Sequence, residues 1–79
     1  MISGSWEYHV VAGPVTRNGE PPDTKTFFEE RYYKVKAMNG GQVKHILVSE
    51  KRVEKDGWGW LGKYLNGLTP EKVPDVIDA

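Results

Sequence analysis

The most regular hydrophobic pattern in this chain is a two-residue alternation, which predicts β-strands. Near the N-terminus, Trp6, Tyr8 and Val10 fall on one face of such a strand, and mainly polar residues separate them. Two later runs are rich in aromatic and β-branched residues, which favour strands. We therefore predict a small antiparallel sheet made of residues 5–12, about 26–38 and 42–48.

The middle run admits two interpretations. Phe28, Tyr32 and Val35 lie at helical spacing, whereas the composition and the following Asn-Gly-Gly turn favour a hairpin. The hairpin interpretation is preferred for at least residues 31–38, and the doublets Phe27-Phe28 and Tyr32-Tyr33 indicate a bulge or a strand covered on both faces. A three-residue turn at 39–41 predicts the pairs Ala37/Val43, Val35/His45, Tyr33/Leu47, Lys36/Lys44 and Lys34/Ile46.

The C-terminal third contains the tryptophan-rich segment 56–67. As a helix it would begin at Asp56, end at Asn66-Gly67 and bury the stripe Trp58, Leu61 and Leu65. As a strand it would place both tryptophans on one face. Three glycines oppose the helix by about 1 kcal/mol each relative to alanine, so both interpretations remain open.

Glycine and proline residues indicate turns and loops in the remaining segments. A Pro/Gly-rich loop is predicted at residues 13–24, and residues 49–55 suit either a short helix or an exposed strand. Thr69-Pro70 is typical of a helix start, and residues 75–79 are expected to fray. The 79 residues form one small domain. The predicted class is α+β, a small antiparallel sheet with a short tryptophan-rich C-terminal helix.

Composition removes several function classes. The chain has no cysteine, which excludes disulfides, thiolate metal sites and a cysteine nucleophile. Its formal net charge is zero, so no whole-surface attraction to a polyanion is expected. The N-terminus lacks the basic and apolar regions of a secretory signal, and no apolar run is long enough to span a bilayer. We expect a cytoplasmic protein that does not interact with membranes.

Candidate catalytic chemistry is sparse. No glycine-rich run ends in the Gly-Lys-Ser/Thr of a phosphate-binding loop. His9 and His45 are the only histidines, and neither has a serine at a spacing that would build a nucleophilic pair. The adjacent Glu29 and Glu30 point to opposite faces of a strand. We therefore expect no enzymatic activity, no metal site and no cofactor.

The charges are unevenly distributed along the chain. Residues 1–24 hold one base and three acids, residues 25–55 eight bases and four acids, and residues 56–79 two bases and four acids, which gives −2, +4 and −2. Basic residues mixed with aromatic residues on a sheet are a means of holding single-stranded nucleic acid. This alternative function would use a basic face made of Lys34, Lys36, Lys44, Lys51 and Lys55.

The preferred function is binding of a protein partner, or self-association. A cysteine-free domain of this size gains stability from a partner, and the chain holds three Trp and four Tyr, the residue types most enriched at binding hot spots together with Arg. The candidate contact residues are Trp58, Trp60, Tyr64, Tyr32 and Arg52.

Residues 56–77 resemble the C-terminal third of SH3 domains. The resemblance rests on Asp56-Gly57-Trp58, Gly62, the step Gly67-Leu68-Thr69-Pro70, and Val73. Gly59 separates two tryptophans that are adjacent in the family, and Val73 replaces a groove tyrosine. The resemblance implies an alternative fold, a small mainly-β barrel, and binding of Pro-rich peptides through Trp58 and Pro70.

Overall fold

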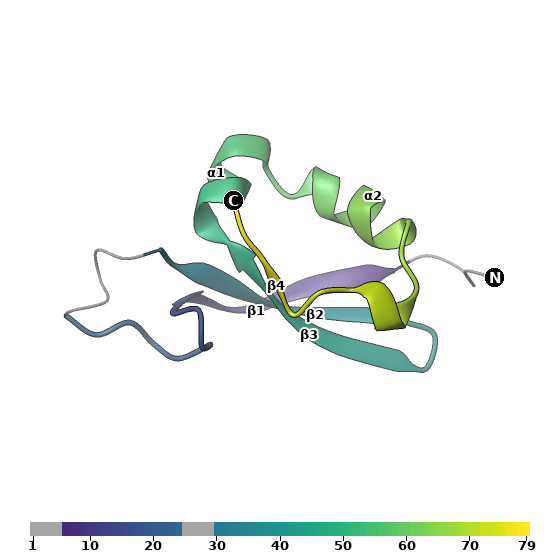
Figure 1. The fold of residues 1–79 in the computed structure, drawn as a ribbon, viewed down its shortest axis with the longest axis horizontal. Helices are drawn as coiled ribbons and strands as arrows, with labels where there is room; N and C mark the ends of the chain where they lie inside the picture. The colour runs from purple at the N-terminus through teal and green to yellow at the C-terminus, as the bar shows by residue number, and fades with distance from the viewer. Residues whose placement is uncertain (1–5, 25–29) are drawn as a thin grey trace.

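The computed structural model describes residues 6–24 and 30–79, which form a four-stranded sheet with two helices on one of its faces (Figure 1). The sheet order follows the chain order, β1-β2-β3-β4. The α+β class is confirmed. The elements are β1 (Glu7–Val15), β2 (Tyr32–Asn39), β3 (Gln42–Ser49), α1 (Glu50–Asp56), α2 (Gly59–Asn66), the 3₁₀ helix η2 (Pro70–Lys72) and β4 (Val76–Ile77).

The turn between β2 and β3 is one residue shorter than expected. Asn39 pairs with Gln42, so only Gly40 and Gly41 form the turn, and Gly40 has φ +61°. A positive φ at the first central residue is the requirement of a II′ hairpin turn, which glycine meets without strain. The predicted register was therefore wrong by one residue: the observed partners are Val35/Ile46, Tyr33/Val48, Ala37/Lys44, Lys36/His45 and Lys34/Leu47.

The corrected register decides which side chains of β3 face the helices. A shift of one residue turns every side chain of a strand to the opposite face. Ile46 and Val48 are consequently buried together with Val35, whereas His45 lies on the uncovered face. We call the side without helices the outer face of the sheet.

The first strand is longer than the sequence pattern indicated. β1 pairs antiparallel with β2 as far as Val15, and its register shifts between Val10 and Ala12 and again between Ala12 and Val15. Such irregularities let a strand bend while pairing continues. The expected loop at 13–24 was therefore wrong at its start, because residues 13–15 belong to β1. In the expected strand 26–38, residues 26–29 lie outside the described residues, and β2 begins at Tyr32.

The helical interpretation of the tryptophan-rich segment is confirmed, and residues 49–55 prove largely helical as well. Asp56 closes α1 instead of capping α2, because Gly57 (φ +74°) ends the first helix and Trp58 stands at the start of the second. Leu61 and Leu65 of α2 are fully buried, as the predicted stripe required. The buried core is Trp6, Val35, Ala37, Ile46, Val48, Leu61, Leu65, Val73 and Ile77.

The C-terminal residues are ordered, so the expected frayed tail at 75–79 was wrong. Val76 and Ile77 pair in parallel with Leu47 and Val48 of β3, and Ile77 is buried in the core. Burial of this apolar side chain holds the short strand β4 in place. The sheet is mixed and open, with β1 and β4 at its two edges. The alternative expectation of an SH3-like barrel was therefore also wrong.

Close packing at Gly13 generates a stability prediction. A Cβ atom at Gly13 would lie 2.6 Å from Tyr33 Cδ1 and 3.2 Å from the Tyr33 backbone, whereas one at Gly62 of α2 would make an ordinary 3.7 Å contact with Tyr8. We expect Gly13→Ala to lower the free energy of unfolding by about 1–3 kcal/mol through overpacking. Gly62→Ala should raise it by about 0.5–1 kcal/mol through helix propensity. Urea denaturation measures both, and a Gly13→Ala variant as stable as the wild type would contradict this packing.

Candidate interaction surfaces

Three of the five predicted contact residues gather on the helices. The Arg52 guanidinium lies 4.2 Å from the centroid of the Trp60 ring, and Trp60 meets Tyr64 edge to face at 6.1 Å. Arg52 and Asp56 pair at 2.8 Å along α1, and the Trp60 indole N–H donates to the Gly57 carbonyl at 2.6 Å. The pairs Arg52/Asp56 and Trp60/Tyr64 follow from i,i+4 spacing within each helix, whereas the contact of Arg52 with Trp60 joins α1 to α2. The polar groups of Arg52 and Trp60 thus already have partners within the chain.

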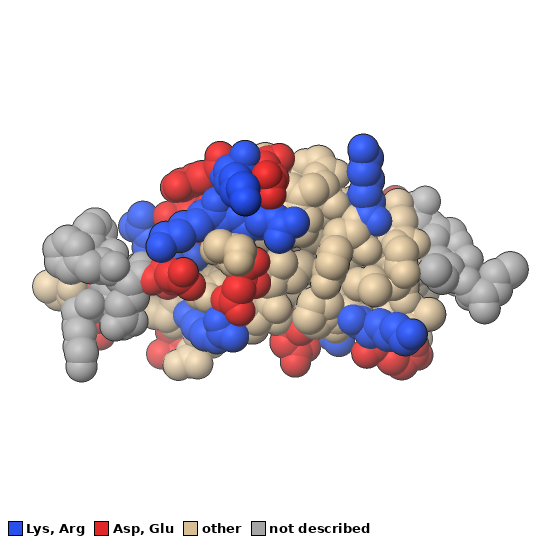
Figure 2. All heavy atoms as spheres, turned by 45° about the horizontal axis from the view of Figure 1, so that its top comes forward, with Lys and Arg blue, Asp and Glu red and all other residues tan. Residues whose placement is uncertain are grey.

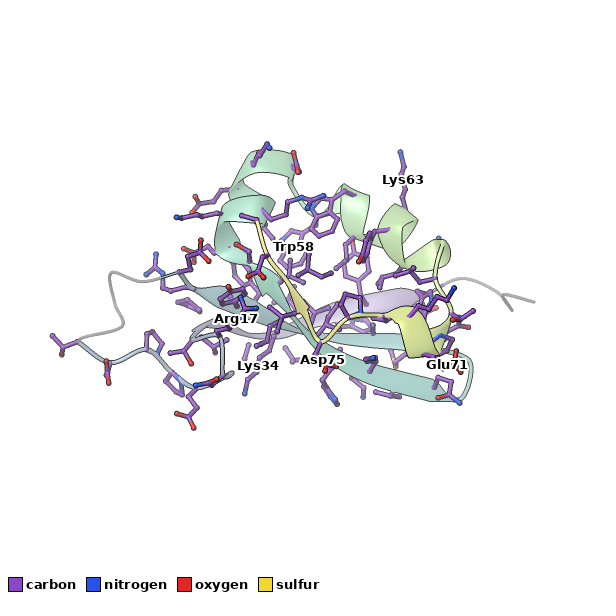
Figure 3. The ribbon with its side chains drawn as sticks, viewed as in Figure 1. Arg17, Lys34, Trp58, Lys63, Glu71 and Asp75 are labelled. Carbon is purple, nitrogen blue, oxygen red and sulfur yellow. The ribbon has the colours of Figure 1, made fainter. Side chains whose placement is uncertain are left out.

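Trp58 lies apart from this cluster, between the helices and the sheet (Figure 3). Its ring stacks with Tyr8 at 6.3 Å and meets Tyr33 edge to face at 5.3 Å. The Tyr8 hydroxyl also donates to the Trp58 carbonyl at 2.8 Å. Trp58 is partly buried against the core, and its contacts anchor the start of α2 to β1 and β2.

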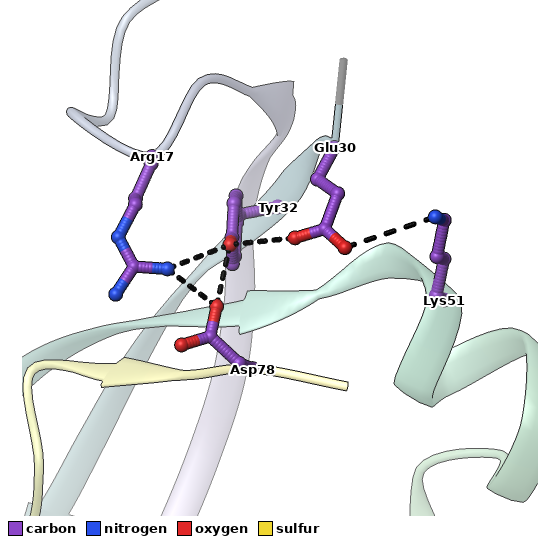
Figure 4. A network of polar contacts seen from close by, with 5 residues as sticks. All are labelled: Arg17, Glu30, Tyr32, Lys51 and Asp78. Atoms are coloured by element: carbon purple, nitrogen blue, oxygen red, sulfur yellow. Dashed lines mark hydrogen bonds and ion pairs between the residues drawn. The ribbon is translucent and has the colours of Figure 1, made fainter.

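Tyr32 is only 1% exposed and offers no surface to a partner. Its hydroxyl lies at the centre of a polar network on the outer-face side of β2 (Figure 4). The hydroxyl donates to Asp78 at 2.6 Å, accepts from Arg17 at 3.0 Å and lies 3.2 Å from Glu30, which pairs with Lys51 at 3.7 Å. The network ties the C-terminal residues to the loop after β1, so we assign Tyr32 a structural role.

The network shifts the pKa values of three of its members, and that of Arg17 is raised by its hydrogen bonds to Asp78 and Tyr32. The hydrogen bond from Tyr32, followed by that from Arg17, holds the pKa of Asp78 below its usual value. Burial, followed by the hydrogen bond to Asp78, raises the pKa of Tyr32. Both shifts favour the state in which Asp78 is a carboxylate and Tyr32 is a neutral donor.

The five lysines of the expected nucleic-acid face do not share one face. Lys34 and Lys36 lie on the outer face of β2, and Figure 3 shows Lys34 projecting away from the helices. Lys44 lies opposite the buried Ala37, and its ammonium donates to the Val73 carbonyl and lies 3.7 Å from Asp75. Lys51 and Lys55 belong to α1, on a surface where bases and acids are interspersed (Figure 2). The expected single basic face was therefore wrong.

The structure places a different basic group together. His9 pairs with Lys36, and Lys36 pairs with His45, so the three residues form one row across β1, β2 and β3. Directly paired residues have Cβ atoms about 4.5–5.5 Å apart and point to the same face. The sequence pattern did not indicate this row, because the expected three-residue turn places Lys44 beside Lys36. A two-residue turn at Gly40-Gly41 gives the pair Lys36/His45, whereas the pair His9/Lys36 depends on the register of β1 against β2.

The edge of β1 is the most open apolar part of the described chain. Only Val15 of its nine residues is buried, and Val10 and Val11 are 46% and 54% exposed. In a two-residue hairpin the closing pair Asn39/Gln42 is hydrogen-bonded, so alternate residues of β2 bond to β3 and the others to β1. Glu7 and His9 therefore bond to β2, and the backbone groups of Tyr8 and Val10 point outward.

Two local features limit this open edge. The register shift at Val11 interrupts regular pairing, and Pro14 has no N–H to donate. Residues 7–10 therefore form the regular part of the edge, with unpaired donors and acceptors at Tyr8 and Val10. An edge of this kind accepts an added strand.

The next observations concern metal sites, membrane-spanning helices, the SH3 resemblance and known proteins. Within residues 6–24 and 30–79, no group of three His, Asp or Glu side chains is arranged to hold a metal ion, and no helix is long and apolar enough to cross a membrane. Of the two positions that the SH3 resemblance implied, Trp58 is partly buried against the core, and Pro70 begins η2. Comparisons with protein-family models, curated protein sequences and solved structures find no match.

The polar network around Tyr32 predicts a pH-dependent stability. Because the folded-state pKa of Asp78 is lowered, its contribution is present above the unfolded-state pKa of about 3.9 and is lost as pH falls through the lower folded-state value. Asp78→Asn should therefore unfold at a lower temperature than the wild type at neutral pH, and the difference should vanish in acid.

Thermal unfolding followed by circular dichroism between neutral and acidic pH measures this difference. The matched control is Asp75→Asn, since the Asp75 side chain is 87% exposed and lies 3.7 Å from Lys44; it should change stability little at any pH. If the difference in unfolding temperature between wild type and Asp78→Asn stayed constant across the pH range, it would contradict the role assigned to the Asp78 carboxylate.

Proposed function

We propose that this protein is a non-enzymatic binding protein that associates with another polypeptide chain through the open edge of β1. The observation that carries the proposal is that the backbone groups of Tyr8 and Val10 point away from β2. The side chain of Val10 is also 46% exposed. A strand added at this edge would satisfy these backbone groups and cover the valine. Main-chain hydrogen bonds then supply affinity, and the neighbouring side chains supply selectivity.

The edge is a better candidate than the cluster on the helices. In that cluster, Arg52 is paired with Asp56 and stacked on Trp60, and the indole N–H of Trp60 is bonded to a backbone carbonyl. A partner binding there would have to compete with these contacts. At β1 the outward backbone groups face solvent, so pairing replaces only their hydrogen bonds to water.

The distribution of side chains favours a protein partner over single-stranded nucleic acid. Stacking of bases requires aromatic rings beside the basic groups. Here Tyr8, Tyr33 and Trp58 pack together on the helical side of the sheet, whereas Lys34 and Lys36 lie on the outer face. On the sheet, the two components of such a site therefore lie on opposite sides of β2, and on the helices the Arg52 guanidinium is already stacked on Trp60 and paired with Asp56.

A charge placed on the edge tests the proposal. Val10→Lys should prevent strand addition, because lysine on an edge strand opposes pairing. Val43→Lys is the matched control, since Val43 is 52% exposed but lies in β3 beside the hairpin turn. We expect both variants to fold, and only Val10→Lys to lose association.

Amide hydrogen exchange followed by NMR locates the contact. In concentrated protein or in cell extract, the amides of Tyr8 and Val10 should exchange more slowly than in dilute buffer. Val43→Lys should retain this protection and Val10→Lys should lose it. Equal exchange rates for both amides under all three conditions would overturn the proposed function.

A further inference from the structure

The open edge of β1 is complementary to itself, and we infer that its partner is a second copy of this chain. The inference rests on the proposed function and specifies the partner. The two strands would run antiparallel about a two-fold axis at His9, and the two four-stranded sheets would join into one. Symmetric pairs of this kind use the same patch on both subunits.

The backbone supports pairing about His9. In an antiparallel pair, hydrogen bonds form between residues whose backbone groups point toward the other strand. Tyr8 and Val10 are the two such residues in the regular part of the edge. An axis at His9 places Tyr8 opposite Val10 of the second copy, and Val10 opposite the second copy's Tyr8. Every outward group of residues 7–10 then acquires a partner.

The side chains on the helical side match in the same register. Tyr8 lies on this face because its hydroxyl bonds to Trp58, and Val10 shares the face by two-residue alternation. The axis therefore brings the exposed Val10 of each copy against Tyr8 of the other. Aromatic and β-branched residues are a favourable cross-strand pair. The contact forms twice and covers Val10 of each copy.

The residues on the outer face would make this dimerisation depend on pH. His9 would stand opposite His9 of the second copy, and the row His9, Lys36 and His45 would continue into its symmetric counterpart. Lys34 lies on the same face. Glu7 also lies there, two residues before His9, and is the acidic residue of β1. Protonation of the histidines would add like charges to a row that already holds Lys36 from each copy, and so would separate the copies.

Sedimentation equilibrium of the full chain tests the pairing and its pH response together. We expect a monomer–dimer equilibrium whose dissociation constant rises at least about tenfold between about pH 7.5 and about pH 5.5, because histidine gains charge in this interval. His9→Gln should dimerise at both pH values. His9→Lys should be monomeric at both, because it carries the charge permanently.

His45→Gln is the matched control, since it removes a histidine from the same row but two strands away from the axis. It should retain the pH response.

A dimer of His9→Lys as tight as the wild type, or a wild-type dimer indifferent to pH, would overturn pairing about His9. A chain that stays monomeric while extract still protects the Tyr8 and Val10 amides would overturn self-association and leave the proposed function standing. A dimer that survives Val10→Lys would overturn both.

Discussion

The two-residue turn at Gly40 and Gly41 determines the rest of the structure, because it sets the register of β2 against β3. With this register, Val35 and Ile46 form a buried pair under the helices, and Val48 extends the same apolar face. The parallel pairing of β4 with β3 follows, since Ile77 reaches the core only beside Val48. One turn in the middle of the chain therefore fixes the position of its C-terminal strand.

The same register distributes the charges. The chain is formally neutral with a basic middle segment, and the hairpin divides that segment between the two sides of the sheet. Lys44 is directed toward Val73 and Asp75, where its charge is partnered, and His45 takes the position beside Lys36 on the outer face. What appears in sequence as one basic surface is in three dimensions a partnered lysine on one side and a histidine–lysine row on the other.

Much of the fold followed from local pattern, and the errors came from interactions between distant residues. The strands and the helix containing Leu61 and Leu65 were predictable, because alternation and helical spacing are local signals. The turn length was not, since a turn of two or of three residues at 39–41 gives plausible apolar pairs. Val76 and Ile77 resembled a frayed end because a two-residue strand has no pattern of its own and exists only by pairing with β3.

For the candidate site residues, the sequence did not indicate where the fold would place them. The doublet Tyr32-Tyr33, which indicated a bulge or a strand covered on both faces, illustrates the reason: β1 shifts its register opposite this doublet, and the two adjacent rings of β2 point to opposite faces. Tyr33 packs on Trp58 beneath the helices, and Tyr32 is buried on the other side by contacts with Arg17 and Asp78. Those contacts join residues far apart in sequence, which no local pattern could reveal.

The limits on the β1 edge bear on how the proposed association would avoid open-ended aggregation. A long, flat, uninterrupted edge would accept strand after strand. Here the irregularity at Val11 and the missing donor at Pro14 confine regular pairing along β1 to residues 7–10, and on the opposite side of the sheet β4 pairs only with Leu47 and Val48 of β3. A two-fold pair would use the β1 edge of both copies, and an interface of this kind closes on itself. The features that shorten the edge thus favour a single, finite assembly.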